Sequence, residues 1–133
     1  MNPYKSFNES YTSPYEPTEG QVPATFDIES KESFEKILEM FPIVVVDVWA
    51  AYCNPCKMIL PKFESLARSF QQQHKEAKII FMKDNIEVHE DIHKPFVSVV
   101  PSFFMYVHGK RYPVPDFREL GVTIETALVD IAV

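Results

Sequence analysis

The sequence predicts an α/β domain in which a central mixed β-sheet is flanked by helices on both faces. Short β-branched runs, such as residues 43–48, alternate along the chain with longer segments whose apolar residues recur at helical spacing. The expected element order is β-α-β-α-β-α-β-β-α, which is typical of a mixed sheet covered by crossover helices. A length of 133 residues suits one domain with a substantial core.

The first part of the chain differs in composition from the rest. Residues 1–24 contain four prolines and three tyrosines among Ser, Thr and Glu, without apolar periodicity. This composition predicts an extended or disordered tail followed by a domain at residues 25–133. In the alternative interpretation, Tyr4, Tyr11 and Tyr15 dock the tail on the domain or on a partner.

The first half of the domain is expected to be strand, helix and strand. A short strand at 26–28 precedes apolar residues at helical spacing between 34 and 41, and Pro42 ends that helix. Residues 43–48 form a β-branched run that is interrupted only by Asp47. Such a run predicts a strand buried on both faces.

The middle of the domain is expected to be helix, strand and helix. Residues 56–70 carry one apolar stripe, and Pro61 within it predicts a kink. Residues 78–82 form another buried strand. A short helix is expected at 86–94. It is expected to end there because Pro95 prevents it from continuing.

The last elements are predicted to be a hairpin and a helix. Strands at 102–107 and 110–114 are separated by a tight turn at residues 108–109. Pro113 indicates that the second of these strands lies at a sheet edge. Thr123 is expected to cap the final helix.

Charge and hydropathy exclude several classes of protein. The net charge of −6 disfavours nucleic acid as a partner, because phosphate binding requires a basic face. No apolar run approaches the roughly 20 residues of a membrane span, and residues 1–5 lack the apolar region of a signal peptide. We therefore expect no nucleic acid, no membrane and a cytoplasmic location, with packaging in a larger particle left open.

The two cysteines are the most informative residues. Cys53 and Cys56 are separated by two residues and follow the most hydrophobic stretch of the chain. In a reducing compartment, a single Cys-x-x-Cys pair indicates redox chemistry rather than a structural disulfide.

Several separated motifs make the chain resemble the thioredoxin family over roughly residues 26–133. They stand in the family's order: Val46-Asp47-Val48-Trp49-Ala50, Cys53-x-Pro55-Cys56-Lys57, Pro61, Val100-Pro101-Ser102-Phe103 and Gly109-Lys110. The resemblance implies the thioredoxin fold and a redox-active disulfide between Cys53 and Cys56.

The resemblance also implies catalytic roles. Cys53, at a helix N-terminus that favours the thiolate, is the expected nucleophile, and Cys56 resolves the mixed disulfide. Asp47 matches an acid that assists proton transfer at the second cysteine, and Lys83 matches a lysine near that acid. The alternatives are a purely structural role for Asp47 and a solvated strand-end position for Lys83.

A substrate groove is implied around the cysteines. Pro101 matches a cis-proline that faces them, and a cis bond turns the backbone toward an extended substrate. Tyr52, Asn54, Pro55 and Val100 complete the expected substrate-binding set. Trp49 is expected beside the site, in a structural role.

The chain departs from the family in three places. Asn54 replaces the usual glycine between the cysteines, and Tyr52 stands where tryptophan is typical. The glycine that usually borders the groove after the last strand is missing, and residues 115–117 occupy that neighbourhood. A narrower groove and a narrower substrate range are therefore expected.

A cation between the cysteines would stabilise the reduced form and so make the protein a better oxidant. Asn54 and Pro55 supply no such cation, which favours a reductant. We expect a monomeric protein disulfide reductase without a bound cofactor, acting in redox homeostasis and electron transport. Its partners are protein disulfides and a separate electron donor, either thioredoxin reductase or a small thiol. The alternatives are a disulfide oxidase or isomerase, and a binding module that uses the groove and the N-terminal tail.

Residues 89–93 match the H-E-x-x-H pattern of zinc proteases. Histidines four apart on a helix can share one metal. However, the expected helix is short, Pro95 ends it, and only His108 and scattered carboxylates offer a third ligand. We expect a solvated polar helix face and no metal, and no zinc at the cysteine pair, since structural zinc requires four ligands.

Overall fold

The computed structural model describes residues 22–132 and contains the following elements in chain order. They are β1 (Thr25–Asp27), α1 (Lys31–Met40), β2 (Ile43–Trp49), α2 (Asn54–Gln73), β3 (Ile79–Asn85), the short 3-10 helix η3 (Lys94–Phe96), β4 (Ser102–Val107), β5 (Lys110–Val114) and α3 (Phe117–Ala132). Residues 1–21, on which the predictions for the tail and its tyrosines depend, lie outside the described part.

The strands form one mixed sheet in the order β1-β3-β2-β4-β5. The pairs β1–β3 and β2–β3 are parallel, whereas β2–β4 and β4–β5 are antiparallel. The predicted fold class, a mixed sheet in an α/β domain, is therefore confirmed. Because β2 is the central strand, it is covered on both faces and all its residues are buried.

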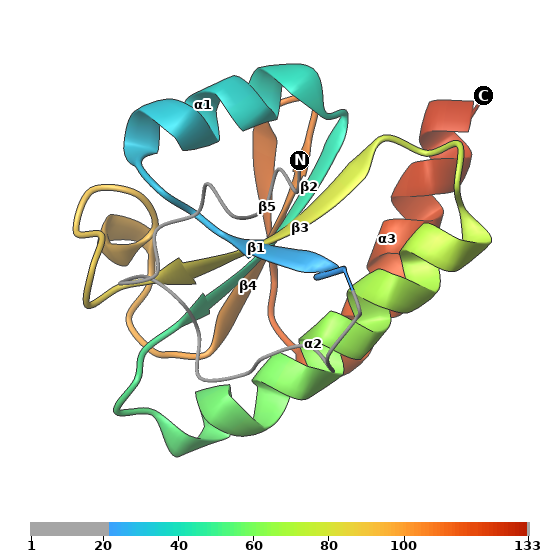
Figure 1. The fold of residues 1–133 in the computed structure, drawn as a ribbon. Helices are drawn as coiled ribbons and strands as arrows, with labels where there is room; N and C mark the ends of the chain where they lie inside the picture. The colour runs from blue at the N-terminus through green and yellow to red at the C-terminus, as the bar shows by residue number, and fades with distance from the viewer. Residues whose placement is uncertain (1–21, 133) are drawn as a thin grey trace.

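The two faces of the sheet are covered by different elements. Figure 1 shows α1 on one side and α2 with α3 on the other. On the α2 side, Phe63, Ile124 and Val45 belong to one buried cluster. On the α1 side, Phe34, Ile92 and Val46 belong to another. The sequence prediction of helices on both faces is confirmed.

The predicted helix at 86–94 is wrong. This segment consists of turns and bends that end in η3. Side-chain bonds to distant elements hold it: the His89 ring contacts the carbonyl of Ile28, and the His93 ring and backbone N–H contact Asp84. These tertiary bonds, which local sequence does not reveal, override the local preference for a helix.

The predicted start of the last helix is also wrong. α3 begins at Phe117, and the backbone N–H of Arg118 donates to the Asp116 carboxylate at 2.8 Å. The Thr123 hydroxyl donates to the carbonyl of Glu119, so this residue lies inside the helix. A threonine in mid-helix can make such a bond one turn back, which makes it a poor marker of a helix start.

The hairpin prediction is confirmed. His108 and Gly109 both have positive φ, at 49° and 81°, and join β4 to β5. Positive φ at both central residues suits a two-residue hairpin turn. Pro113 lies in β5, the edge strand, as expected. Pro61 lies within α2, and the kink there stays a prediction.

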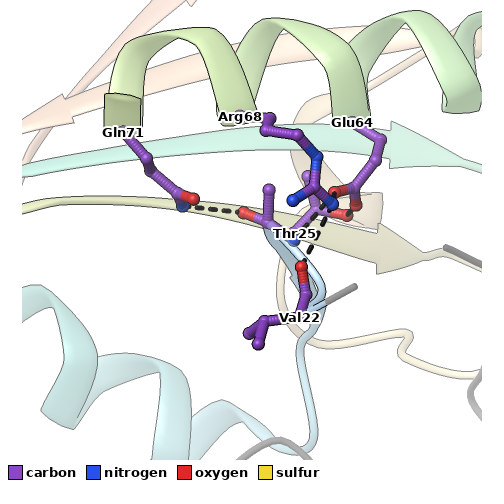
Figure 2. Close-up of polar contacts among 6 residues, drawn as sticks. Val22, Thr25, Glu64, Arg68 and Gln71 are labelled. Carbon is purple, nitrogen blue, oxygen red and sulfur yellow. Dashed lines mark hydrogen bonds and ion pairs between the residues drawn. The ribbon is translucent and has the colours of Figure 1, made fainter. Parts of the chain in front are cut away.

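The start of the described chain is fastened to α2, as Figure 2 shows. The buried Glu64 carboxylate accepts from the Ala24 backbone N–H at 2.7 Å and from the Thr25 hydroxyl at 2.8 Å. Arg68 donates to Glu64 and to the carbonyl of Val22. Within residues 22–132, no helix is long and apolar enough to cross a membrane.

Candidate active site

The cysteine pair lies where β2 ends and α2 begins. Cys53 is the N-cap of α2, and its Sγ accepts a hydrogen bond from the backbone N–H of Cys56 at 3.2 Å. The two residues form a disulfide. Cys53 is 8% exposed, whereas Cys56 is fully buried. Of the two residues, only Cys53 keeps any exposure to solvent.

The position of Cys53 favours the charged form of its thiol. The N-terminus of a helix presents unpaired N–H groups and the positive end of the helix dipole, and both stabilise a thiolate. Pro55 lies in the first turn of α2, where its missing N–H costs no hydrogen bond. In the reduced form, the N–H of Cys56 can still donate to the first sulfur.

The loop that contains Pro101 lies against the first sulfur. The Val100–Pro101 peptide bond is cis, as the family resemblance implies. The carbonyl oxygen of Val100 lies 3.6 Å from Sγ of Cys53. A chain segment bound beside residues 100–101 would therefore lie next to the reactive sulfur.

The other residues predicted to bind substrate surround this point. Tyr52, Asn54 and Pro55 are exposed, and Val100 and Pro101 are half-buried. Trp49 is buried in one cluster with both cysteines and with Leu60. The structure therefore places the predicted residues around the disulfide, with Trp49 packed behind it.

Two contacts that sequence reasoning missed hold the loop before Cys53. The backbone N–H of Ile86 donates to the carbonyl of Trp49 at 3.0 Å, and the Ala51 N–H donates to the Glu87 carboxylate at 2.5 Å. Glu87 belongs to the segment that was expected to be an exposed helix. Its sequence context carries no signal for this role, because the contact depends on the path of the following turn.

Asp47 lies on the sheet face that α2 covers and is fully buried. Neither of its carboxylate oxygens has a hydrogen-bond partner among the described residues. Burial raises the pKa of Asp47 to about 8, and the opposing effect of the nearby Lys83 ammonium is smaller. A carboxyl with such a pKa can both hold and release a proton near neutral pH.

Lys83 is buried rather than solvated, so the surface position considered for it is wrong. It pairs with Asp47 in the register of β2 and β3, and its Nζ lies 3.9 Å from Oδ1 of Asp27. Asp27 was not identified as a site residue from the sequence. The polar residue at the end of a short apolar strand was the available signal.

The histidines of residues 89–93 do not form a solvated helix face. Both rings are buried, and the ring of His93 lies between Asp84, at 2.8 Å, and the Tyr106 hydroxyl, at 2.7 Å. Burial raises the pKa of Tyr106 to about 12, so this hydroxyl keeps its proton. The described residues contain no group of three side chains placed to hold a metal ion.

The segment without the usual glycine follows β5 near the cis-proline loop. Val114 pairs with Phe103 in the antiparallel register, which directs Pro115 toward Ser102, the residue after Pro101. Pro115 is exposed, and Asp116 forms an ion pair with Arg118 at 2.6 Å. The narrower groove stays a prediction.

Known proteins resemble both the sequence and the fold. The family described as Thioredoxin matches residues 25–126. Thioredoxin from Mycoplasma genitalium is 29% identical over 79% of this chain and 94% of its own length. Mouse (Mus musculus) thioredoxin is 34% identical over 63% of this chain and 77% of its own length.

A solved structure of Plasmodium falciparum thioredoxin has a TM-score of 0.65 and 24% identity. The similarity covers 75% of this chain and 96% of that one. The strand order, the cysteine pair at the start of α2 and the cis-proline loop beside it agree with the family match, which spans most of the chain. The chain therefore belongs to the thioredoxin family.

Proposed function

We propose that this protein reduces protein disulfides through a Cys53–Cys56 dithiol. The observation that carries the proposal is the asymmetry of the pair: Cys53 caps α2 and keeps 8% exposure, whereas Cys56, one turn later, is fully buried. Such an arrangement separates an attacking sulfur from a resolving one. Members of the family act on protein disulfides, and the proposal adds the reducing direction.

The first step is attack by the Cys53 thiolate on one sulfur of a substrate disulfide. A new sulfur–sulfur bond forms between Cys53 and the substrate, the substrate's own disulfide breaks, and its other sulfur leaves as a thiolate. The N–H of Cys56, which contacts Sγ at 3.2 Å, stabilises the attacking thiolate. The thiolate that leaves the substrate takes a proton from solvent.

The second step requires Cys56 to lose its proton inside the protein. The Cys56 thiolate then attacks Sγ of Cys53, the Cys53–Cys56 disulfide forms, and the second substrate thiolate is released. Asp47 is the proposed acceptor of the Cys56 proton, because it is buried under α2 and its pKa of about 8 suits transfer near neutral pH. Lys83 is proposed to assist by stabilising the carboxylate.

Substrate is proposed to bind along residues 100–101 and over Tyr52, Asn54 and Pro55. Tyr52 is 70% exposed, so its ring is available for apolar contact with the substrate. The turned backbone at Pro101 offers hydrogen bonds to an extended segment. Electrons come from a separate donor, either thioredoxin reductase or a small thiol, and we propose a cytoplasmic monomer.

Insulin reduction with dithiothreitol tests the activity. The wild type is expected to accelerate precipitation of the insulin B chain, and Cys53→Ser is expected to give only the rate of dithiothreitol alone. Ser65→Ala, at an exposed position on α2, is the matched control and retains the wild-type rate. A folded wild type that leaves the dithiothreitol rate unchanged contradicts the proposal.

The reduction potential separates a reductase from the alternative, an oxidase or isomerase. Because Asn54 and Pro55 supply no cation, we expect a potential near that of thioredoxin, about −270 mV, measured by equilibration with glutathione. A value near −120 to −180 mV, as in oxidising relatives, favours the oxidase or isomerase alternative.

A further inference from the structure

Three ionisable side chains form a row across neighbouring parallel strands beneath α2. Asp27 of β1 pairs with Lys83 of β3, and Lys83 pairs with Asp47 of β2. Residues paired in register point their side chains to the same face of a sheet. Because β3 lies between β1 and β2, Lys83 stands between two carboxyl groups.

The row is shielded from solvent along its length. Asp47 is fully buried, and the side chains of Lys83 and Asp27 are only 8% and 12% exposed. Charges interact more strongly here than at the surface, because less water screens them. The Lys83 ammonium is 3.9 Å from Asp27, and its field also lowers the pKa of Asp47 against the larger effect of burial.

Few other charges face Asp47. From β4, its register partner is Phe103, which carries no charge. From α2, Glu64 is paired with Arg68 at 2.9 Å, and Cys56 is in the disulfide. α3 contributes apolar side chains, including Leu120 and Ile124, to this side of the sheet. Lys83 is the charged group that acts on Asp47 most directly.

We propose that Asp27 is a positioning residue that engages the Lys83 ammonium from the β1 side and so limits the stabilisation that Lys83 gives to the Asp47 carboxylate. When Asp47 is ionised, the ammonium is shared between two carboxylates instead of serving one. The consequence for catalysis rests on the proposed function: Asp27 sets the pH range in which Asp47 can take the proton of Cys56.

The test is a carboxyl-carbon NMR titration of Asp47 in the oxidised protein, in which the cysteines do not titrate. Asp27→Asn keeps the shape of the side chain and removes its charge. We expect the pKa of Asp47 to fall by about one unit. Glu29→Gln, at an exposed position two residues further along, is the matched control and leaves this pKa unchanged.

A second pair of variants tests whether the effect passes through Lys83. In a Lys83→Gln background, Asp27→Asn is expected to shift the pKa of Asp47 by less than half as much as in the wild type. Lys83→Met serves as the background if the glutamine variant does not fold. An unchanged Asp47 pKa in Asp27→Asn, or an equal shift in both backgrounds, overturns the proposal.

The titration also separates this inference from the proposed function, because it requires no catalytic turnover. A shift that depends on Lys83 supports the role of Asp27 even if insulin is not reduced. An active reductase in which Asp27→Asn leaves the Asp47 pKa unchanged contradicts the role of Asp27 and leaves the reductase proposal intact.

Discussion

Asp47 on β2 and Glu64 on α2 are both buried acidic side chains, but their surroundings differ. Glu64 is 2% exposed and accepts three hydrogen bonds, from a backbone N–H, a hydroxyl and a guanidinium. Asp47 is fully buried, and neither oxygen has such a partner among the described residues. The first carboxylate is satisfied and fastens β1 to α2. The second is held at an energetic cost, which is typical of a working group.

Among buried acids, complete hydrogen bonding distinguishes a structural carboxylate from a functional one. A carboxylate whose bonds are complete stabilises the fold, and removing it leaves its donors unpaired. A carboxyl without partners is destabilising when ionised, so its presence calls for another explanation. Asp84 lies between the two cases, because one of its oxygens is bonded to His93 and the other has no hydrogen-bond partner among the described residues.

The largest expected loss of stability is in Glu64→Ala. The Ala24 N–H, the Thr25 hydroxyl and the Arg68 guanidinium would all lose their acceptor. We expect the free energy of unfolding, measured in urea, to fall by about 3 kcal/mol. Glu35→Ala, at an exposed position in α1, is the control and should change it by less than about 0.5 kcal/mol. A small loss in Glu64→Ala would show that the hydrogen bonds of Glu64 do not stabilise the fold.

Asp47→Asn is expected to have the opposite sign. The native state no longer has to hold a carboxyl that burial disfavours in its charged form. At pH 7, we expect the oxidised variant to be more stable than the wild type by about 2 kcal/mol or more. Urea unfolding of both proteins measures this difference, and a variant less stable than the wild type would show that Asp47 is a satisfied structural acid.

The pH dependence sharpens this prediction. Folding raises the pKa of Asp47 from 3.8 to about 8, so between these values the native state binds one proton more than the unfolded state. The stability of the wild type therefore falls relative to Asp47→Asn as pH rises from about 4 to 8, by about 1.4 kcal/mol per pH unit, and levels off above. A difference that does not change with pH would contradict the raised pKa.

Tyr106→Phe tests the buried hydroxyl that contacts His93 and is expected to have the smallest effect. The variant removes the hydroxyl that contacts His93 but leaves the bonds between His93 and Asp84. We expect a loss of about 1 kcal/mol, measured by urea unfolding. Tyr112→Phe, on the exposed side of β5, is the control. Equal stability of Tyr106→Phe and the wild type would show that this hydroxyl contributes nothing to the network.

Asp47 could be predicted from the sequence, because an acid that interrupts a β-branched run is conspicuous. The cysteine pair was found through its spacing, and Pro101 through the resemblance to the thioredoxin family. Glu64 was missed, although it lies on the buried face of an amphipathic helix, because its partner Ala24 is 40 residues away in the chain. Local patterns carry no information about such contacts.

The segment at 86–94 shows the same limit more clearly. This segment was expected to be an exposed helix, but His93 is buried between Asp84 and Tyr106. Each of these partners lies on a different strand, and nothing in the local sequence indicates that a histidine will be placed between them. The fold could be predicted because periodicity is local, whereas these polar contacts depend on tertiary structure.

The most direct test of the account is a single-turnover reduction of insulin at pH 7 by the fully reduced wild type, Asp47→Asn and Glu64→Gln. Because Asp47 is proposed to accept the proton of Cys56, we expect release of the mixed disulfide to slow by at least about tenfold in Asp47→Asn. Glu64→Gln keeps a bonded side chain away from the sulfurs and should react within about twofold of the wild type. Equal rates in Asp47→Asn and the wild type would contradict the proposal that Asp47 accepts the proton of Cys56.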